Sequence, residues 1–381
     1  MKIINSLSYL FFNILETLLR FFPIPAKTGL VKIGEPNEMS PVFLTVNFHL
    51  TVLRVKKALR GLNCYLLVAN SHGINVWCAA AGGHFNNHSV ISILKTSGIN
   101  ELVKHRKIIL PQLAAVGIEK KVVKEKTGWN IIWGPVYAKD IPIFLRNDFK
   151  KEDCLREIKF TILERLEMVG MWSFLFTILV LIPVSIFWIN EVIFVLIVVW
   201  LPATLLFILF PYYEPLLKKE EIAKKSIHNL FTKVIIFSIS LVITMTPIVV
   251  TYFYSKTYSQ MFLLRWTLIS SLVILSLIID LKGSTPIYKS DIIEESKYKT
   301  LLDKEKCKGT GICIDVCPRN CYSMDEKEKK VEIVNSIDCI KCGACIVQCP
   351  FDALSFITPT GKIIQPETIR TYKLNLSGKR V

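Results

Sequence analysis

The sequence has few of the features of an exported or nucleic-acid-binding protein. It holds 31 acidic against 47 basic residues, a net charge of +16, and only six histidines in 381 residues. Nucleic acid is one partner that such a charge would suit, but no basic-aromatic array or nucleic-acid-binding motif occurs. The first apolar stretch ends at Pro23 and Pro25 without the small residues of a signal-peptide cleavage site. We therefore expect no nucleic-acid partner and no cleavable signal.

Acidic residues and histidines are also missing from the middle of four long apolar stretches, residues 171–188, 192–210, 234–254 and 261–279. Each stretch is long enough to cross a bilayer. The missing mid-span acids favour an anchor over an ion pathway. Arg265 is the one charge inside a stretch, and its place near an end lets its side chain reach the membrane surface.

Lysines give these four stretches an orientation. The turn between the first two holds Glu191 and no basic residue, whereas the connector between the second and third holds five lysines: Lys218, Lys219, Lys224, Lys225 and Lys233. By the positive-inside rule this connector is cytoplasmic. The sequence thus predicts a multi-pass protein of the cell membrane, in contact with lipid, whose N-terminal and C-terminal domains are both cytoplasmic.

The chain divides by composition into five parts. Residues 1–30 contain an amphipathic helix at 6–22, which lies on the membrane surface or packs on its own domain. Residues 31–168 form an α/β domain, 169–282 the transmembrane helices, 283–299 a polar linker, and 300–381 a cysteine-rich α+β domain with a basic tail.

The α/β domain alternates apolar runs with helical patterns. Strands are predicted at 41–47, 63–70, 107–111 and 130–133, and helices at 50–59, 89–96, 119–126 and 139–147. A further helix at 152–168 leads to the membrane. This order predicts a parallel sheet with helices on its faces, whose ligands bind beyond the carboxyl ends of the strands.

Eight of the eleven cysteines lie within residues 307–349, at the spacing of cluster ligands rather than of disulfides. The second of two motifs is complete: Cys339-x2-Cys342-x2-Cys345-x3-Cys349-Pro350. In such a motif three thiolates hold one [4Fe–4S] cluster and the fourth reaches the other cluster, which requires a reducing compartment. A structural zinc site is the alternative, but it explains neither the proline nor the paired motif.

The first motif, Cys307-x5-Cys313-x3-Cys317-Pro318, has Thr310 where a second ligand is expected. Residues 300–358 resemble bacterial-type two-cluster ferredoxins. The resemblance implies that Cys317, Cys339, Cys342 and Cys345 hold one [4Fe–4S] cluster and that Cys307, Cys313 and Cys349 hold the other. That second site is expected to carry a [3Fe–4S] cluster, a [4Fe–4S] cluster with a non-cysteine ligand, or a [4Fe–4S] cluster completed by Cys321. Ferredoxins that lack this cysteine often hold three irons, so we favour the first outcome.

Cys78 lies in an apolar helical turn of the N-terminal domain, where a lone thiol is usually part of the core. However, the segment GINVWCAA at Gly73–Ala80 resembles the cap-helix signature of the mercury-methylation corrinoid proteins, which are related to the corrinoid iron–sulfur protein of acetyl-CoA synthesis. The resemblance covers residues 25–290 and includes Thr45, Asn47 and the segments Pro111–Leu113 and Gly134–Val136. The usual partner of that family is a separate two-cluster ferredoxin, and here a ferredoxin is fused.

The resemblance implies a cobamide, a corrinoid cofactor, at the mouth of the sheet, with Cys78 as the lower axial ligand of cobalt. A soft thiolate suits a metal–carbon centre and would make the opposite methyl group more carbanion-like. Asn75 and Trp77 would orient the helix, although each could equally be a capping or packing residue. Thr45 and Asn47 are the other expected cofactor contacts. The Asp-x-His-x-x-Gly signature of histidine-ligated cobalamin proteins is absent.

Three departures weaken mercury as the substrate. Ala81-Gly82 replaces the family's Gly-Lys, His84 replaces a threonine, and Ala114–Gly117 departs from the family's Gly-Ala-Pro-Gly. We therefore expect a corrinoid methyltransferase with a fused reductant that needs an electron donor, a methyl donor and a methyl acceptor. The acceptor could be Hg(II), another metalloid, a thiol or an enzyme. The alternative is a membrane-bound electron-transfer protein whose N-terminal domain binds no corrinoid.

Overall fold

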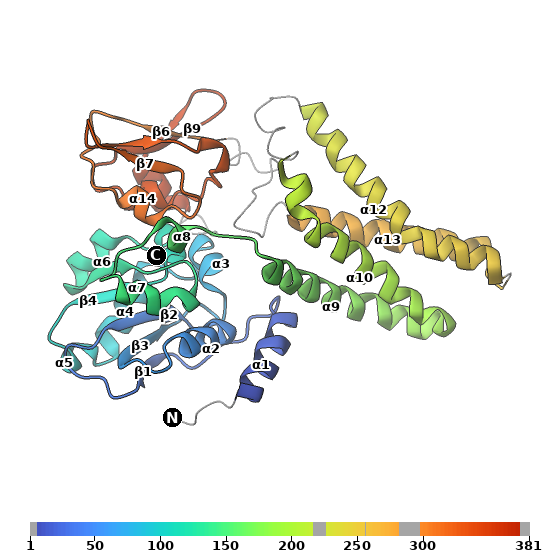
Figure 1. The fold of residues 1–381 in the computed structure, drawn as a ribbon, viewed down its shortest axis with the longest axis horizontal. Helices are drawn as coiled ribbons and strands as arrows, with labels where there is room; N and C mark the ends of the chain where they lie inside the picture. Colours follow the sequence, from blue (N-terminus) through green and yellow to red (C-terminus); the bar gives the residue numbers. More distant parts are fainter. Residues whose placement is uncertain (1–5, 216–225, 256, 282–297, 374–381) are drawn as a thin grey trace. The chain divides into compact units, whose positions relative to one another are not determined.

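The computed structural model describes residues 6–215, 226–255, 257–281 and 298–373 (Figure 1). Most of the predicted linker, the end of the basic tail, and Lys218, Lys219, Lys224 and Lys225 lie outside these ranges. The chain divides into two compact units. One unit contains the α/β domain together with the cysteine-rich domain, and the other contains the apolar helices.

A five-stranded sheet in the order β1-β3-β2-β4-β5 forms the centre of the α/β domain. Its strands are β1 (Gly29–Ile33), β2 (Val42–Val46), β3 (Cys64–Ala69), β4 (Lys107–Leu110) and β5 (Asn130–Trp133). The four predicted strands are present, and they are parallel to one another. The prediction of a purely parallel sheet is wrong, because β1 pairs with β3 in the antiparallel sense. The sheet is therefore mixed.

Helices cover both faces of this sheet, and β2 and β3 are therefore buried throughout. Leu44 and Leu67 belong to a core cluster with α3 (Val76–Ala81), α4 (Asn87–Thr96), the 3-10 helix η1 (Gln112–Val116) and α6 (Lys120–Thr127). Phe43 and Leu66 point the other way, toward α2 (His49–Ala58) and α7 (Ile141–Arg146). A short α5 (Ile99–Leu102) and the 3-10 helix η2 (Ala138–Asp140) connect these elements.

The predicted helix at 152–168 is wrong. α8 covers only Asp153–Arg156, and a new helix, α9 (Ile162–Phe187), begins six residues further on. Thr161 starts α9 with a capping box, in which its hydroxyl faces the Glu164 amide and the Glu164 carboxylate accepts from the Thr161 amide. This local signal outweighs the continuous helical pattern, so that the α/β domain ends near Ile158.

The second unit contains four helices long and apolar enough to cross a membrane, at Ile162–Phe187, Ile189–Ile208, Lys233–Ser255 and Gln260–Ile279. They belong to α9, the 3-10 helix η3 (Ile189–Glu191) with α10 (Val192–Ile208), α12 (Ser226–Ser255) and α13 (Gln260–Leu281). Arg265, the charged residue inside the last stretch, lies near the start of α13. Its guanidinium pairs with the carboxylate of Glu191, which also accepts from Trp266 Nε1 at 2.8 Å.

The N-terminal helix α1 spans Ser6–Leu18, which is shorter than the predicted 6–22. Leu7 and Phe11 are exposed, as on a helix that lies on a membrane surface. Farther along, Phe21 packs edge-on against Trp172 of α9, with ring centroids 5.0 Å apart. The stretch thus combines an exposed apolar part with a packed end.

The cysteine-rich domain repeats one structural pattern twice. The helices α14 (Ile312–Val316) and α15 (Ala344–Gln348) each begin at a left-handed glycine. Two antiparallel sheets surround them, one of β6 (Lys299–Leu302), β9 (Leu354–Ile357) and β10 (Ile363–Ile364), the other of β7 (Tyr322–Asp325) and β8 (Lys330–Ile333). The 3-10 helix η5 (Ser336–Asp338), α16 (Pro366–Thr368) and the π-helical turn η6 (Ile369–Lys373) complete the domain.

Candidate functional site

Cys78 lies on α3, which follows the carboxyl end of β3 where parallel sheets bind ligands. The helix buries Ala79 and Ala80 completely and leaves the Cys78 thiol exposed. Asn75 caps the helix, because its side chain accepts a hydrogen bond from the Cys78 amide at 3.0 Å. Cys78 is therefore not a core residue, and its thiol can reach a ligand outside the sheet.

Asn47 fixes the loop that leads into α3. Its buried side-chain oxygen accepts from the amides of Ser71 and Gly73 at 2.8 and 3.1 Å and lies 3.0 Å from the Ser71 hydroxyl. Gly73 has a φ of +70°, and a Cβ there would come within 3.0 Å of the Pro25 nitrogen. Asn47 thus acts on Cys78 through the loop. Trp77 is half-buried against the same core.

Thr45 is not brought near Cys78. Side chains alternate along a strand, and Thr45 shares the face of Phe43, toward α2 and α7, whereas Leu44 and Val46 face α3. Thr45 is 1% exposed, and its hydroxyl oxygen has no hydrogen-bond partner in the described part of the chain. The structure therefore separates this predicted cofactor contact from the thiol.

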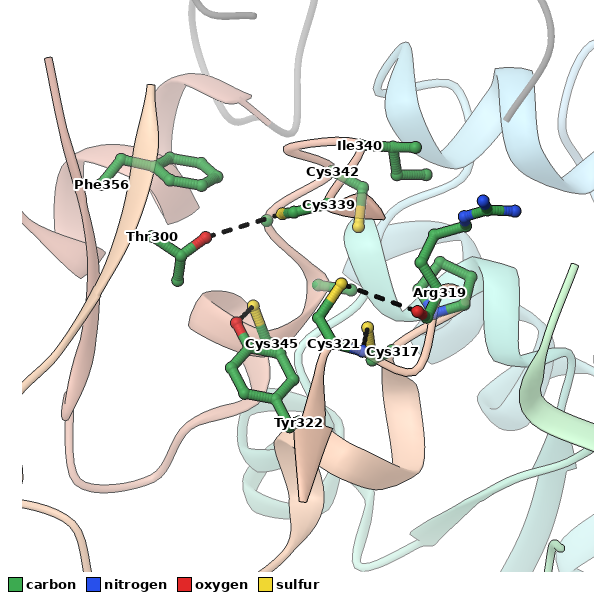
Figure 2. Close-up of a pocket in the computed structure, with 13 residues that line it drawn as sticks. Thr300, Cys317, Arg319, Cys321, Tyr322, Cys339, Ile340, Cys342, Cys345 and Phe356 are labelled. Carbon is green, nitrogen blue, oxygen red and sulfur yellow. Dashed lines mark hydrogen bonds between the residues drawn. The ribbon is translucent and has the colours of Figure 1, made fainter. Parts of the chain in front are cut away.

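Four predicted ligands converge in the cysteine-rich domain. Figure 2 shows Cys317, Cys339, Cys342 and Cys345 around one pocket, in which Cys321 adds a fifth thiol. The Tyr322 hydroxyl donates to Cys345 Sγ at 3.0 Å, and the Thr300 hydroxyl lies 3.6 Å from Cys339 Sγ. Neither contact is predictable from the sequence, because neither Tyr322 nor Thr300 belongs to a spacing motif.

The protein environment acts in opposite directions on two thiols of this pocket. Hydrogen bonding from the Cys321 thiol lowers the pKa of Cys339 to about 5, whereas burial raises the pKa of Cys345 well above its usual value. Neighbouring buried thiolates repel one another unless positive charge lies between them. No three histidine, cysteine or acidic side chains within the described ranges close around a single ion. The thiols of Cys317, Cys339, Cys342 and Cys345 line one pocket and belong to paired ferredoxin-type motifs, which fits an iron–sulfur cluster.

Cys307, Cys313 and Cys349 form a second group. The Cys313 thiol interacts electrostatically with Cys349 and Cys307, and burial, together with these two thiols, raises its pKa to about 12. The proposed completion of this group by Cys321 is wrong. The Cys321 amide donates to Cys317 Sγ at 3.3 Å, and its thiol lies beside Cys317 and Cys339 in the other pocket.

Comparison with known proteins agrees with this division into two sites. Residues 20–145 match the family described as the CO dehydrogenase/acetyl-CoA synthase delta subunit. Residues 306–353 match the 4Fe-4S dicluster domain. The fold and the thiols thus define a corrinoid-protein-like α/β domain joined to a ferredoxin-type dicluster domain.

Among curated proteins, the chain is similar to the acetyl-CoA decarbonylase/synthase complex subunit gamma of Methanocaldococcus jannaschii. The two are 37% identical over 131 residues, which is 34% of this chain and 26% of the relative. The corrinoid/iron-sulfur protein large subunit of Moorella thermoacetica is 35% identical over 126 residues, 32% of this chain and 28% of the relative. The chain thus spans about a quarter of the length of these relatives.

Proposed function

We propose that the protein is a membrane-anchored corrinoid methyl-transfer protein whose own ferredoxin domain supplies the electrons that reduce cobalt. The observation that carries the proposal is the exposed Cys78 thiol on α3, at the carboxyl end of a sheet that matches corrinoid proteins. A bound cobamide would supply a cobalt that can accept a methyl group and pass it on. The exposed thiol on its capped helix would let Cys78 serve as a sulfur ligand of that cobalt.

Each residue around Cys78 has a defined task in this proposal. Cys78 donates a soft sulfur, Asn75 holds its amide, and Asn47 fixes the loop before the helix. The cysteines of the dicluster domain would hold one [4Fe–4S] cluster and a second cluster at the group that lacks a fourth thiol. An external low-potential donor would reduce these clusters.

The methyl donor would be a protein or a small molecule, and the acceptor a soft electrophile such as Hg(II), another metalloid or a thiol. A soft sulfur from Cys78 would raise the electron density on a bound cobalt, which would suit methyl transfer to a soft electrophile. Methylmercury formation from Hg(II) by the loaded protein separates mercury from the other acceptors. The four apolar helices would anchor the protein in the cell membrane, with both domains in the cytoplasm.

The test is metal analysis of the full chain produced with a supplied cobamide. We expect cobalt and iron together, with about one cobalt per chain. Cys78→Ala should shift the absorption spectrum of the corrinoid and leave the iron–sulfur signals unchanged. Cys154→Ala is the matched control, because Cys154 is also exposed and lies outside the α3 region. Iron without cobalt would refute the proposal and favour a membrane-bound electron-transfer protein.

A further inference from the structure

The ferredoxin domain and the α/β domain share one hydrophobic core within the same compact unit. Ala115 and Val116 of η1 are fully buried in a cluster that also contains Val316 of α14 and Ile346 and Val347 of α15. The helix η1 packs against α14 and α15, and it packs against α3 as well. A short segment of chain, Gln112–Lys120, therefore lies between the cluster-ligand helices and the helix that carries Cys78.

Gln348 joins α15 to this segment through all of its side-chain polar atoms. Its Nε2 donates to the carbonyl oxygens of Ala115, at 2.7 Å, and Ile118, while its Oε1 accepts from the Lys120 amide at 3.3 Å. Gln348 is 7% exposed, so water cannot replace these bonds without opening the interface. It lies between the cluster ligands Cys345 and Cys349.

Lys151 makes the corresponding contact with α14. Its ammonium group donates to the Asp315 carbonyl at 2.7 Å and to Gln112 Oε1 at 2.8 Å, and it lies 3.0 Å from the Asp315 carboxylate. The Lys151 side chain is 1% exposed. Asp315 lies between the ligands Cys313 and Cys317. Each cluster motif thus contributes one buried polar contact to the same surface.

A third contact involves backbone alone. The Ile158 amide donates to the carbonyl oxygen of Pro318 at 2.9 Å, next to the ligand Cys317. On the other side of the segment, Gly117 has no room for a side chain, because a Cβ would come within 2.7 Å of the Ala80 carbonyl oxygen in α3. The segment is therefore held tightly on both of its sides.

We propose that Gln112–Lys120 is the electron-transfer dock of the fused ferredoxin, and that Gln348 and Lys151 are the positioning residues that hold the domain there. The role of the dock rests on the proposed function. Bound clusters and a bound cobamide would supply the chemistry, one electron passing from a reduced cluster to reduce cobalt(II) to cobalt(I), and no bond in the protein would form or break. The ferredoxin acts from a fixed position beside α3 and not as a freely tethered domain.

Hydrogen exchange on the full chain in detergent tests the dock, because the exchange rate of the Ile158 amide can be measured without a bound cobamide. Gln348→Ala should speed exchange of the Ile158 amide at least tenfold, although Gln348 does not contact Ile158, because the contacts open together. Gln365→Ala is the matched control, since Gln365 is exposed on the same domain. Unchanged Ile158 exchange in Gln348→Ala, with clusters intact by absorption, would overturn the proposal.

A second variant avoids the cluster motif. Lys151→Glu places a carboxylate against Asp315 and should also speed Ile158 exchange at least tenfold, whereas Lys150→Glu, at the adjacent exposed lysine, should not. Adding Asp315→Lys to Lys151→Glu should restore protection. If the double variant forms its clusters but does not regain protection of the Ile158 amide, the ion pair does not hold the dock and the proposal fails for Lys151.

The electron-transfer role is tested on cobamide-loaded protein reduced with dithionite. Gln348→Ala should slow the appearance of cobalt(I) at least tenfold, with unchanged cluster signals. An unchanged rate in a variant that has lost Ile158 protection would refute this surface as the electron route. A chain that binds no cobalt would refute the proposed function instead, and the exchange experiment would still decide whether the dock exists.

Discussion

Thr310 is the residue at which the two cluster motifs differ, and Thr310→Cys tests the assignment of the second cluster. The two ligand loops share one pattern of positive φ angles. Thr310 lies between two residues with φ of +64° and +70°, and Cys342 lies between two with φ of +53° and +80°: Gly309 and Gly311 in the first loop, Lys341 and Gly343 in the second. Each loop then enters a five-residue helix. A cysteine at position 310 should therefore occupy the place that Cys342 has in its own loop.

The size of the effect follows from this equivalence. If the wild-type site holds three irons, its chain contains about seven irons, and Thr310→Cys should raise the number to about eight. The paramagnetic signal of an oxidised three-iron cluster should disappear. Thr310 is exposed, so the smaller cysteine leaves no internal cavity. Iron analysis and electron paramagnetic resonance of anaerobically purified protein measure both quantities.

Thr310→Ser is the control, because it changes the side chain without adding a thiol and should leave about seven irons. An unchanged iron content in Thr310→Cys, with the three-iron signal still present, would show that residue 310 does not face the cluster. About eight irons in the wild-type protein would show instead that a non-cysteine ligand completes a four-iron cluster. That result would refute the three-iron assignment. Whether residue 310 faces the cluster would then be decided by comparing the paramagnetic resonance signals of the wild-type protein and Thr310→Cys.

Three further predictions concern other parts of the chain. Cys321→Ser should leave the signal of the Cys307, Cys313 and Cys349 group unchanged, and a loss of that signal would contradict the separation of the two groups of cysteines. Glu191→Ala should lower the stability of the helical unit by about 3 kcal/mol, measured by thermal unfolding in detergent, because it leaves the mostly buried guanidinium of Arg265 without its carboxylate. Burial lowers the pKa of Lys151 to about 8 against the opposing attraction of Asp315. The separated domains would bind the Lys151 proton up to about pH 10.5. Docking should therefore strengthen as the pH rises above about 8, by at most about 3 kcal/mol, and Ile158 exchange rates corrected for their intrinsic pH dependence measure the change. Lys151→Met should abolish this slope.

The four parallel strands could be predicted because each is a short run of buried apolar residues bounded by polar ones. β1 could not be predicted, because four of its five residues are only partly buried or exposed, and its place depends on pairing with β3, more than thirty residues away in sequence. The break between α8 and α9 was missed for a different reason. The helical pattern continues through residues 157–161, and only the capping box at Thr161 marks a new helix.

Predictions of the site divide in the same way. Cysteine spacing predicted which thiols gather, because metal-ligand spacing is a local property of the sequence. The side of the sheet on which Thr45 lies was not predictable, since both faces of β2 are apolar and the strand shows no alternation between polar and apolar residues. Glu191 and Arg265 lie 74 positions apart, and no local pattern indicates that they pair.

The dock shows why a cluster motif can carry more information than its cysteines. A bound cluster would fix the positions of its ligands and of the short helices α14 and α15, so that the other residues of these helices would be held in fixed directions. Asp315 and Gln348 occupy such positions, and neither is needed as a ligand. Changes there can adjust the contact with another domain without changing the ligand set. Because the same helix carries the ligand and the contact, the contact made by Asp315 or Gln348 would fix the position of a cluster bound there relative to the α/β domain.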